Sequence, residues 1–400
     1  MNTPPAASPL RVLLLSPVEG IDPACGDTVY TAELMASPPP GVEYEDYASA
    51  LAGGRLVEHG RREALLAARG AQRISELASV GRARFIDGLR RRGVLFREPF
   101  REFSVRPGTY DLVHCHVFSV SFRNRLPLVI SNAGLLDDLY LGARRWSPRR
   151  VRRAVHGDAL LAAAMGVQHA SLRAPKADRF VCFTDSLRDA LVARGAVDPA
   201  QVEIIPIPVR VTRQRAEKPP TTIGFIATDF EAKGGATVLR AWSLIQSALP
   251  RCRLLIVGSE PRLSAAEALA ARVEWLPRVS RDHLVRDLLP SVDVLAYPTR
   301  ADGMPLVVLE ALGAGIPAAV SDYRALPEII GGHGNGGLVS GIDDAPGLAN
   351  NLLRLLRSEE HAEFSARARR LYECRYSPVA VGAKLRSAYD AAIAAARVVR

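Results

Sequence analysis

Short apolar runs alternate with longer stretches of helical period along almost all of the 400-residue chain. This alternation predicts parallel sheets covered by helices on both faces. The strands expected in the first half are Arg11–Ser16, Val42–Tyr47, Asp111–His116, Leu128–Ser131, Arg179–Phe183 and Val202–Ile205. The helices expected between them include Thr28–Met35, Asp158–Arg173 and Ser186–Arg194.

A polar, proline-bearing stretch from Pro206 to Pro220 interrupts this pattern. Residues before proline are pushed out of helical geometry, so we place a linker there. A second alternation follows, with strands expected at Thr222–Thr228, Arg253–Gly258, Val273–Leu276, Val292–Tyr297, Pro317–Ser321 and Gly337–Val339. The fold class is therefore α/β, with two Rossmann-like domains facing each other across a cleft. We draw the boundaries at 1–208 and 209–378, with a final helix over 379–400.

The balance of charge favours an anionic partner. The formal net charge is +10, which suits nucleic acid, acidic lipid headgroups or phosphorylated small molecules. The stretch from Arg55 to Arg106 is helical in period and rich in arginine. Its first interpretation is a solvated helical surface, and its second is a patch for an anionic membrane surface. Nucleic acid is the weakest interpretation, because stacking aromatics and a recognisable binding motif are lacking.

The five cysteines are scattered and form no Cys-x-x-Cys pair. Neither a disulfide framework nor a zinc site is indicated, so we expect no metal and a reducing compartment. No window approaches the roughly 18–20 apolar residues that a membrane span needs. We therefore expect a cytoplasmic protein, at most peripheral on the inner face of the cell membrane.

The most informative segment runs from Tyr297 to Pro317. A strand ends near Tyr297, a loop carries Asp302 and Gly303, and a helix opens behind Pro305, so the free amides of its first turn form an anion site. Glu310 lies in an otherwise apolar helix and needs a polar partner. Two carboxylates flanking such amides suit a phosphate placed between two hydroxyl-bearing sugars, as in a nucleotide-sugar.

This segment resembles the donor-site signature of the family four retaining glycosyltransferases (glycosyl transferases group 1), which have the GT-B fold. Asp302 and Glu310 keep the spacing of the family's two acids. The resemblance implies that Asp302 binds hydroxyls of the transferred sugar and Glu310 the nucleotide ribose. Donor contacts are implied for the residues between them, Gly303, Met304, Pro305, Leu306 and Val307. Two departures stand out: Asp302 replaces a glutamate, and Met304-Pro305 replaces Phe-Gly.

A second match lies in Ile223–Gly235, which resembles the first strand of the family's second domain and its loop. The resemblance implies that Lys233 neutralises the donor diphosphate; the alternative is an exposed lysine before a helix. Thr228 stands about where the family has an arginine, and Arg300 is a candidate replacement. Arg278 lies in a loop that resembles the one meeting the donor base.

The first domain matches more loosely. Asp111–His116 resembles a strand end of the family, and its two histidines, His114 and His116, face the same side of a strand. Packing, zinc ligation with a further ligand, and a role of His116 beside the transferred sugar all remain open. Acceptor-side candidates are Gly26 and Asp27, for which a plain turn is an equal alternative, and Asn132, which follows another strand. The final helix resembles the one that crosses back to the first domain.

Together these features predict a retaining, metal-independent glycosyltransferase. It would move a sugar from a UDP- or GDP-sugar to a hydroxyl of a glycan or lipid-linked saccharide, without a cofactor and without nucleic acid as a partner. Lys233, Asp302 and His116 are the predicted catalytic residues. A catalytically weak binding or scaffold protein of the same fold is the alternative; a nucleic-acid binder and a nucleotide-sugar epimerase are more distant ones.

Overall fold

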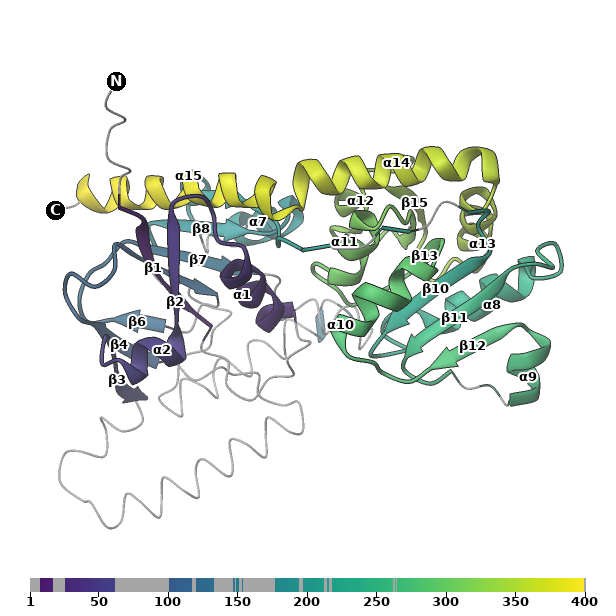
Figure 1. The fold of residues 1–400 in the computed structure, drawn as a ribbon, viewed down its shortest axis with the longest axis horizontal. Coiled ribbons are helices and arrows are strands. Elements are labelled where there is room, and N and C mark those ends of the chain that lie inside the picture. The colour runs from purple at the N-terminus through teal and green to yellow at the C-terminus, as the bar shows by residue number, and fades with distance from the viewer. Residues whose placement is uncertain are drawn as a thin grey trace, which may run out of the picture.

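The computed structural model describes residues 8–16, 26–61, 101–116, 120–132, 147, 149–150, 153, 177–193, 197–211, 214–215, 218–261, 263 and 265–398. These residues form two α/β domains side by side, and two long C-terminal helices run along both (Figure 1). The predicted fold class, α/β with two Rossmann-like domains, is confirmed.

The first domain is built on a six-stranded parallel sheet in the order β2-β1-β5-β7-β8-β9. Its strands are β1 (Leu10–Leu15), β2 (Val42–Asp46), β5 (Leu112–His116), β7 (Leu128–Asn132), β8 (Arg179–Cys182) and β9 (Val202–Ile204). Its helical segments include, within the described residues, α1 (Gly26–Ala36), α2 (Tyr47–Ala52), α7 (Asp185–Ala193) and a short turn at Pro199–Gln201. Every strand predicted for this half lies within about two residues of an observed one.

The second domain carries a parallel sheet in the order β12-β11-β10-β13-β14-β15. Its strands are β10 (Thr222–Ala227), β11 (Arg253–Gly258), β12 (Val273–Leu276), β13 (Val294–Tyr297), β14 (Ala318–Ser321) and β15 (Gly337–Ser340). Its helical segments are α8 (Gly235–Ile245), α9 (Ala265–Ala270), α10 (Arg281–His283), η4 (Leu284–Leu288), η5 (Leu289–Ser291), α11 (Leu306–Gly313), α12 (Leu326–Ile329), α13 (Ala345–Leu355) and α14 (Ser358–Arg375). The order reverses direction between β10 and β13, and ligands bind at such a switch point in open α/β sheets.

The apolar strands follow from burial on both faces. All six residues of β10 are buried, as in the continuous apolar runs of parallel sheets. On one face of this sheet, α8 and α13 close a core around Trp242. On the other face, a larger core continues through Ile205, Ile207 and Val209 into the first domain. The two domains therefore share packed apolar side chains beside the linker.

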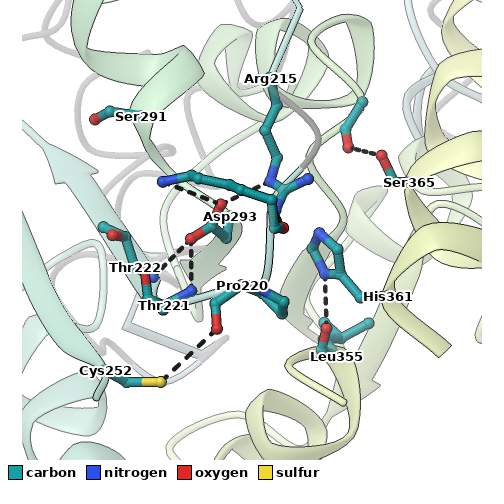
Figure 2. A network of polar contacts seen from close by, with 12 residues as sticks. Arg215, Pro220, Thr221, Thr222, Cys252, Ser291, Asp293, Leu355, His361 and Ser365 are labelled. Carbon is teal, nitrogen blue, oxygen red and sulfur yellow. Dashed lines mark hydrogen bonds and ion pairs between the residues drawn. The ribbon is translucent and has the colours of Figure 1, made fainter. Parts of the chain in front are cut away.

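The linker is fixed to the second domain by a buried carboxylate at the start of β13. Asp293 is fully buried, and it accepts hydrogen bonds from the Arg215 Nε at 2.7 Å and from the amides of Thr221 and Thr222 at 2.7 and 2.8 Å. Figure 2 shows Arg215 reaching this carboxylate from the linker side. This network lies at the amino ends of β10 and β13, so it does not occupy the carboxyl ends of these strands.

Helix α15 (Pro378–Val398) lies over the first domain, whereas α14 lies over the second (Figure 1). Tyr389 of α15 is fully buried, and its hydroxyl lies 2.6 Å from the His114 Nδ1 and 2.7 Å from the Tyr44 hydroxyl. The C-terminal helix is thus built into the core of the first domain. The exact domain boundaries stay a prediction.

One predicted helical stretch begins and ends with strands instead. The stretch from Arg55 to Arg106 was expected to be helical, yet it begins with β3 (Leu56–Arg61) and ends with β4 (Arg101–Val105). These strands pair antiparallel, and β4 pairs in parallel with β6 (Val120–Phe122). Leu56 and Phe103 are buried by this small sheet, which helical periodicity alone does not anticipate. The arginine-rich middle, residues 62–100, lies outside the described residues, as does the helix predicted at Asp158–Arg173.

Candidate donor site

A cavity of about 420 Å³ lies at the switch point of the second sheet. Its wall contains the ends of three neighbouring strands and the segments that follow them, represented by Thr228, Gly258 and Tyr297. The start of α11 and the loop before α10 complete the wall. All its lining residues belong to the second domain, so this domain alone shapes the cavity.

Two glycines bring the backbone segments around this cavity together. Gly234, at the start of α8, has a φ of 83°, and a Cβ there would collide with the carbonyl oxygen of Pro298. Gly258, at the end of β11, has a φ of 107°, and a Cβ there would collide with the Ala227 carbonyl oxygen. Only glycine adopts these conformations without strain at such close approach. The first of them sets Lys233 beside the loop that follows β13.

Lys233 and Asp302 form an ion pair on this wall, with both side chains 16% exposed. The Lys233 ammonium also donates to the Ala301 carbonyl at 3.4 Å, and the Tyr297 hydroxyl donates to Asp302 Oδ2 at 2.8 Å. Burial and the neighbouring Asp302 carboxylate hold the pKa of Tyr297 well above its usual range. Tyr297 therefore remains a hydrogen-bond donor that orients the shorter acid.

Glu310, the second acid, is 2% exposed and pairs with Arg281. Its Oε1 accepts from the Arg281 Nη2 at 2.7 Å and from the Nε at 3.1 Å. Burial raises the pKa of Glu310, while the Arg281 guanidinium opposes that rise. The polar partner that an acid in an apolar helix requires is thus an arginine from α10.

The first turn of α11 faces the cavity through Leu306 and Val307. Pro305 precedes the helix and lacks an N–H. The next two amides, those of Leu306 and Val307, come before the first amide that bonds back, which is Val308 to the Pro305 carbonyl at 3.2 Å. Met304 is buried on the same wall. The positive end of the helix dipole therefore points at the cavity, which favours an anionic ligand there.

The structure brings together most residues that the sequence assigned to donor binding. The predicted residues on the cavity wall are Lys233, Asp302, Glu310, Met304, Pro305, Leu306, Val307, Thr228 and Arg278. Gly303 lies in the same loop between two of them. The roles given to these residues stay predictions, because proximity alone does not assign them.

Arg300 does not line the cavity. Its Nη1 pairs with Asp343 at 2.6 Å and its Nη2 donates to the Glu231 carbonyl at 2.9 Å. The suggestion that Arg300 replaces the absent family arginine is therefore not supported. Arg281 and Tyr297 line the cavity instead, and the sequence predicted a role for neither. Tyr297 could have been found from its position at the strand end; Arg281 could not, because arginine is abundant throughout the chain.

His116 is 1% exposed and does not line this cavity. Its Nδ1 lies 2.9 Å from the Ser131 hydroxyl, and its ring stacks on Phe183 with centroids 5.7 Å apart. His114 is fully buried, and burial lowers its pKa to about 3. The geometry is that of a packed network, and a role of His116 beside an acceptor stays a prediction without geometric support.

The acceptor-side candidates are placed only in part. Gly26 and Asp27 lie in the first turn of α1, with side chains outside the described residues, and Asn132 ends β7 half-buried. In the part of the chain that the structure describes, no group of three or more His, Cys, Asp or Glu side chains could hold a metal ion. Within that same part, no helix is both long and apolar enough to cross a membrane.

Comparisons with known proteins find similarity to glycosyltransferases. Residues 220–358 match the family model of the glycosyl transferases group 1. The D-inositol 3-phosphate glycosyltransferase of Mycolicibacterium paratuberculosis is 26% identical over 291 residues, which cover 64% of this chain and 61% of that relative. The match thus spans less than two thirds of the length of this curated relative.

Two solved structures share the fold over nearly the whole chain. Sucrose-phosphate synthase from Thermosynechococcus elongatus superposes with a TM-score of 0.57 and 15% identity, covering 95% of this chain and 98% of that one. The Anabaena protein HepE, in complex with UDP and glucose, gives a TM-score of 0.55 and 13% identity over 94% and 98% of the two chains. Residues 220–358 thus match the glycosyl transferases group 1, and the chain has the GT-B fold of two Rossmann-like domains.

Proposed function

We propose that this protein transfers a sugar from a nucleoside diphosphate sugar to a hydroxyl acceptor with retention of anomeric configuration. One observation carries the proposal: an ammonium, two carboxylates and a helix N-terminus, from Lys233, Asp302, Glu310 and α11, surround one cavity at the switch point of the second sheet. A nucleotide-sugar presents groups that match these: sugar and ribose hydroxyls for the two carboxylates, and a diphosphate for the ammonium and the helix N-terminus.

The leaving group is a nucleoside diphosphate, which gains negative charge as the glycosidic bond breaks. Lys233 and the free amides of Leu306 and Val307 would stabilise that charge, which is the largest contribution that fixed donors make to such reactions. A diphosphate in the cavity would compete with Asp302 for the Lys233 ammonium, and Asp302 would then accept from hydroxyls of the transferred sugar. Glu310 would accept from the ribose.

These residues supply charge stabilisation without a metal ion, and we propose that the reaction is metal-independent. We further propose that the departing phosphate assists the incoming hydroxyl on the same face of the sugar, which retains the configuration. The donor would be a UDP- or GDP-sugar. The acceptor would be a glycan or a lipid-linked saccharide, approached from the side of the first domain, at the cytoplasmic face of a membrane.

The test is a panel of UDP- and GDP-sugars incubated with the full chain, with and without a membrane lipid extract. Release of UDP or GDP is measured for the wild type, for Glu310→Gln, and for Glu359→Gln as a control at the exposed start of α14. We expect one donor to release nucleotide, with a loss in Glu310→Gln alone. Activity in EDTA tests metal independence, and nuclear magnetic resonance of the product tests retention.

Two results would contradict the proposal. If the folded protein binds a nucleotide-sugar but releases nothing with any extract, the binding or scaffold alternative holds. If it binds no nucleotide-sugar at all, the donor site itself is wrong.

A further inference from the structure

The acid that faces the cavity from α11 is connected to the other domain. Arg281, which holds Glu310, also pairs through its Nη1 with Glu33 Oε1 at 3.0 Å. Glu33 belongs to α1 of the first domain, and Figure 1 shows α1 and α10 on the facing sides of the two domains. A single guanidinium thus joins the first domain to a residue of the donor cavity.

Glu33 is itself held firmly. It is 2% exposed, and its Oε2 accepts from the Arg210 amide at 3.0 Å and from the Arg210 Nε at 2.9 Å. Arg210 lies in the linker, so Glu33 is fixed between linker and second domain. The cluster contains two carboxylates and two guanidiniums, which balances its charge at a site where an unpaired charge would be costly.

The geometry of Glu310 leaves room for a ligand. Both hydrogen bonds from Arg281 end on Oε1, and within the described residues Oε2 has no hydrogen-bond partner. The same side chain lines the cavity. A guanidinium bound to one oxygen fixes the plane of a carboxylate, because its hydrogen bonds are directional. The second oxygen is then presented in a defined direction.

We propose that Glu33 and Arg281 are positioning residues for the donor nucleotide: Glu33, from the first domain, holds Arg281 against Glu310, and Arg281 presents the free oxygen of Glu310 to the ribose. This inference rests on the proposed function, since it assumes that Glu310 binds the nucleotide. It adds that donor affinity depends on a residue of the first domain, although that residue does not line the cavity.

A pH dependence follows. Within the described residues, the charged groups that face Glu310 are Arg281 from α10 and Glu33 from α1, with Lys233, Arg278 and Asp302 on the cavity wall. Burial raises the pKa of Glu310 and Arg281 opposes that rise. Loss of Arg281 would move this pKa further up, since the remaining neighbour, Glu33, is a like charge. Protonation would then remove the carboxylate as pH falls, and nucleotide affinity would drop at a higher pH than in the wild type.

The experiment measures the affinity of the full chain for UDP and for GDP by calorimetric titration between pH 5.5 and 8.5. Arg281→Gln is expected to weaken binding about 10-fold near pH 7 and to move the acid limb of the affinity profile up by about one pH unit. Glu33→Gln is expected to weaken binding about 3- to 10-fold. In Arg281→Gln/Glu310→Gln the shift of the acid limb should disappear.

Two controls match these changes. Glu328→Gln removes another carboxylate that bridges the domains, where Glu328 accepts from the Asp185 amide at 3.0 Å, without touching Glu310. Arg286→Gln removes an exposed cation of the same segment, which pairs with Asp282. Both should bind the nucleotides within about twofold of the wild type, because neither contacts the cavity. Arg281→Lys keeps the charge, and should return the acid limb toward its wild-type position even if Arg281→Gln folds poorly.

The possible failures are distinguishable. If the wild type binds UDP or GDP and Glu33→Gln and Arg281→Gln bind equally well at every pH, the positioning role is wrong while the donor site stands. Equal weakening by Glu328→Gln and Glu33→Gln would also overturn it, because the effect would then reflect domain contact in general. If the wild type binds neither nucleotide, the proposed function fails first.

Discussion

The two domains share one architecture but use the carboxyl ends of their central strands in opposite ways. In the second domain, charged side chains such as Lys233 and Glu310 surround a cavity. In the first domain, the end of β5 carries His114 and His116, which are buried and bonded to Ser131 and Tyr389. One strand end is open to a ligand, and the other is filled by the protein itself.

Sheet topology alone therefore does not create a ligand site, because the side chains at the strand ends decide whether a cavity forms. In the second domain, glycines bring backbone segments together around a cavity that charged side chains line, whereas aromatic rings from α1 and α15 pack against His114 in the first. Substitutions in the second domain should therefore act on binding and transfer, and those in the network around His114 should act on folding.

The largest effect is expected at Lys233. Lys233→Ala removes the cation beside the expected diphosphate, and loss of one such group lowers turnover by about 100- to 1,000-fold. The measurement is nucleotide release from the donor found in the panel. Lys384→Ala, on the exposed face of α15, removes the same charge elsewhere and should keep full activity. A Lys233→Ala variant with wild-type turnover would show that Lys233 does not stabilise the leaving group.

His114→Phe should act on stability instead. An aromatic ring of somewhat larger volume remains, but both nitrogens are lost, and the hydroxyls of Tyr389 and Ser131 each lose a hydrogen bond inside the core. The free energy of unfolding in urea should fall by about 1–3 kcal/mol, while nucleotide affinity changes less than twofold. His283→Phe, at an exposed position, is the control. A loss of nucleotide affinity without a loss of stability would contradict the contrast.

The same histidine predicts how stability depends on pH. Burial lowers the pKa of His114 to about 3, so the folded protein keeps it neutral while the unfolded chain protonates it near pH 6.5. Stability from this group is complete above that pH and is lost as pH falls toward 3, by at most about 1.4 kcal/mol per pH unit. Urea unfolding at pH 5 and 7 should show a smaller difference in His114→Phe than in the wild type. An equal difference in both would assign the pH dependence to other groups.

The smallest effect is expected at Tyr297. Tyr297→Phe removes only the hydroxyl that orients Asp302, which corresponds to about 1 kcal/mol, or roughly fivefold in the KM for the donor. Tyr47→Phe removes a similar bond to Glu58 in the first domain, and should leave KM unchanged. If both variants have the wild-type KM, Asp302 does not depend on Tyr297 for its orientation.

The sequence predicted the two sheets and most of the donor cavity, because periodicity and a conspicuous acidic pair carry that information locally. It did not predict β3 and β4, whose pairing depends on a distant strand, nor the part played by Arg281. Glu33 and Arg281 are 248 positions apart, and their contact exists only because α1 and α10 face each other across the domains. His116 shows the opposite case. Its motif resembles the family's, but its side chain is enclosed by local packing and does not face the cavity.

A crystal structure of the full chain with UDP or GDP bound would test the donor site most directly. The proposed site places the diphosphate beside the Lys233 ammonium and the first amides of α11, with ribose hydroxyls on Glu310 Oε2. A nucleotide bound elsewhere, or bound in the cavity with its phosphates away from Lys233, would contradict it.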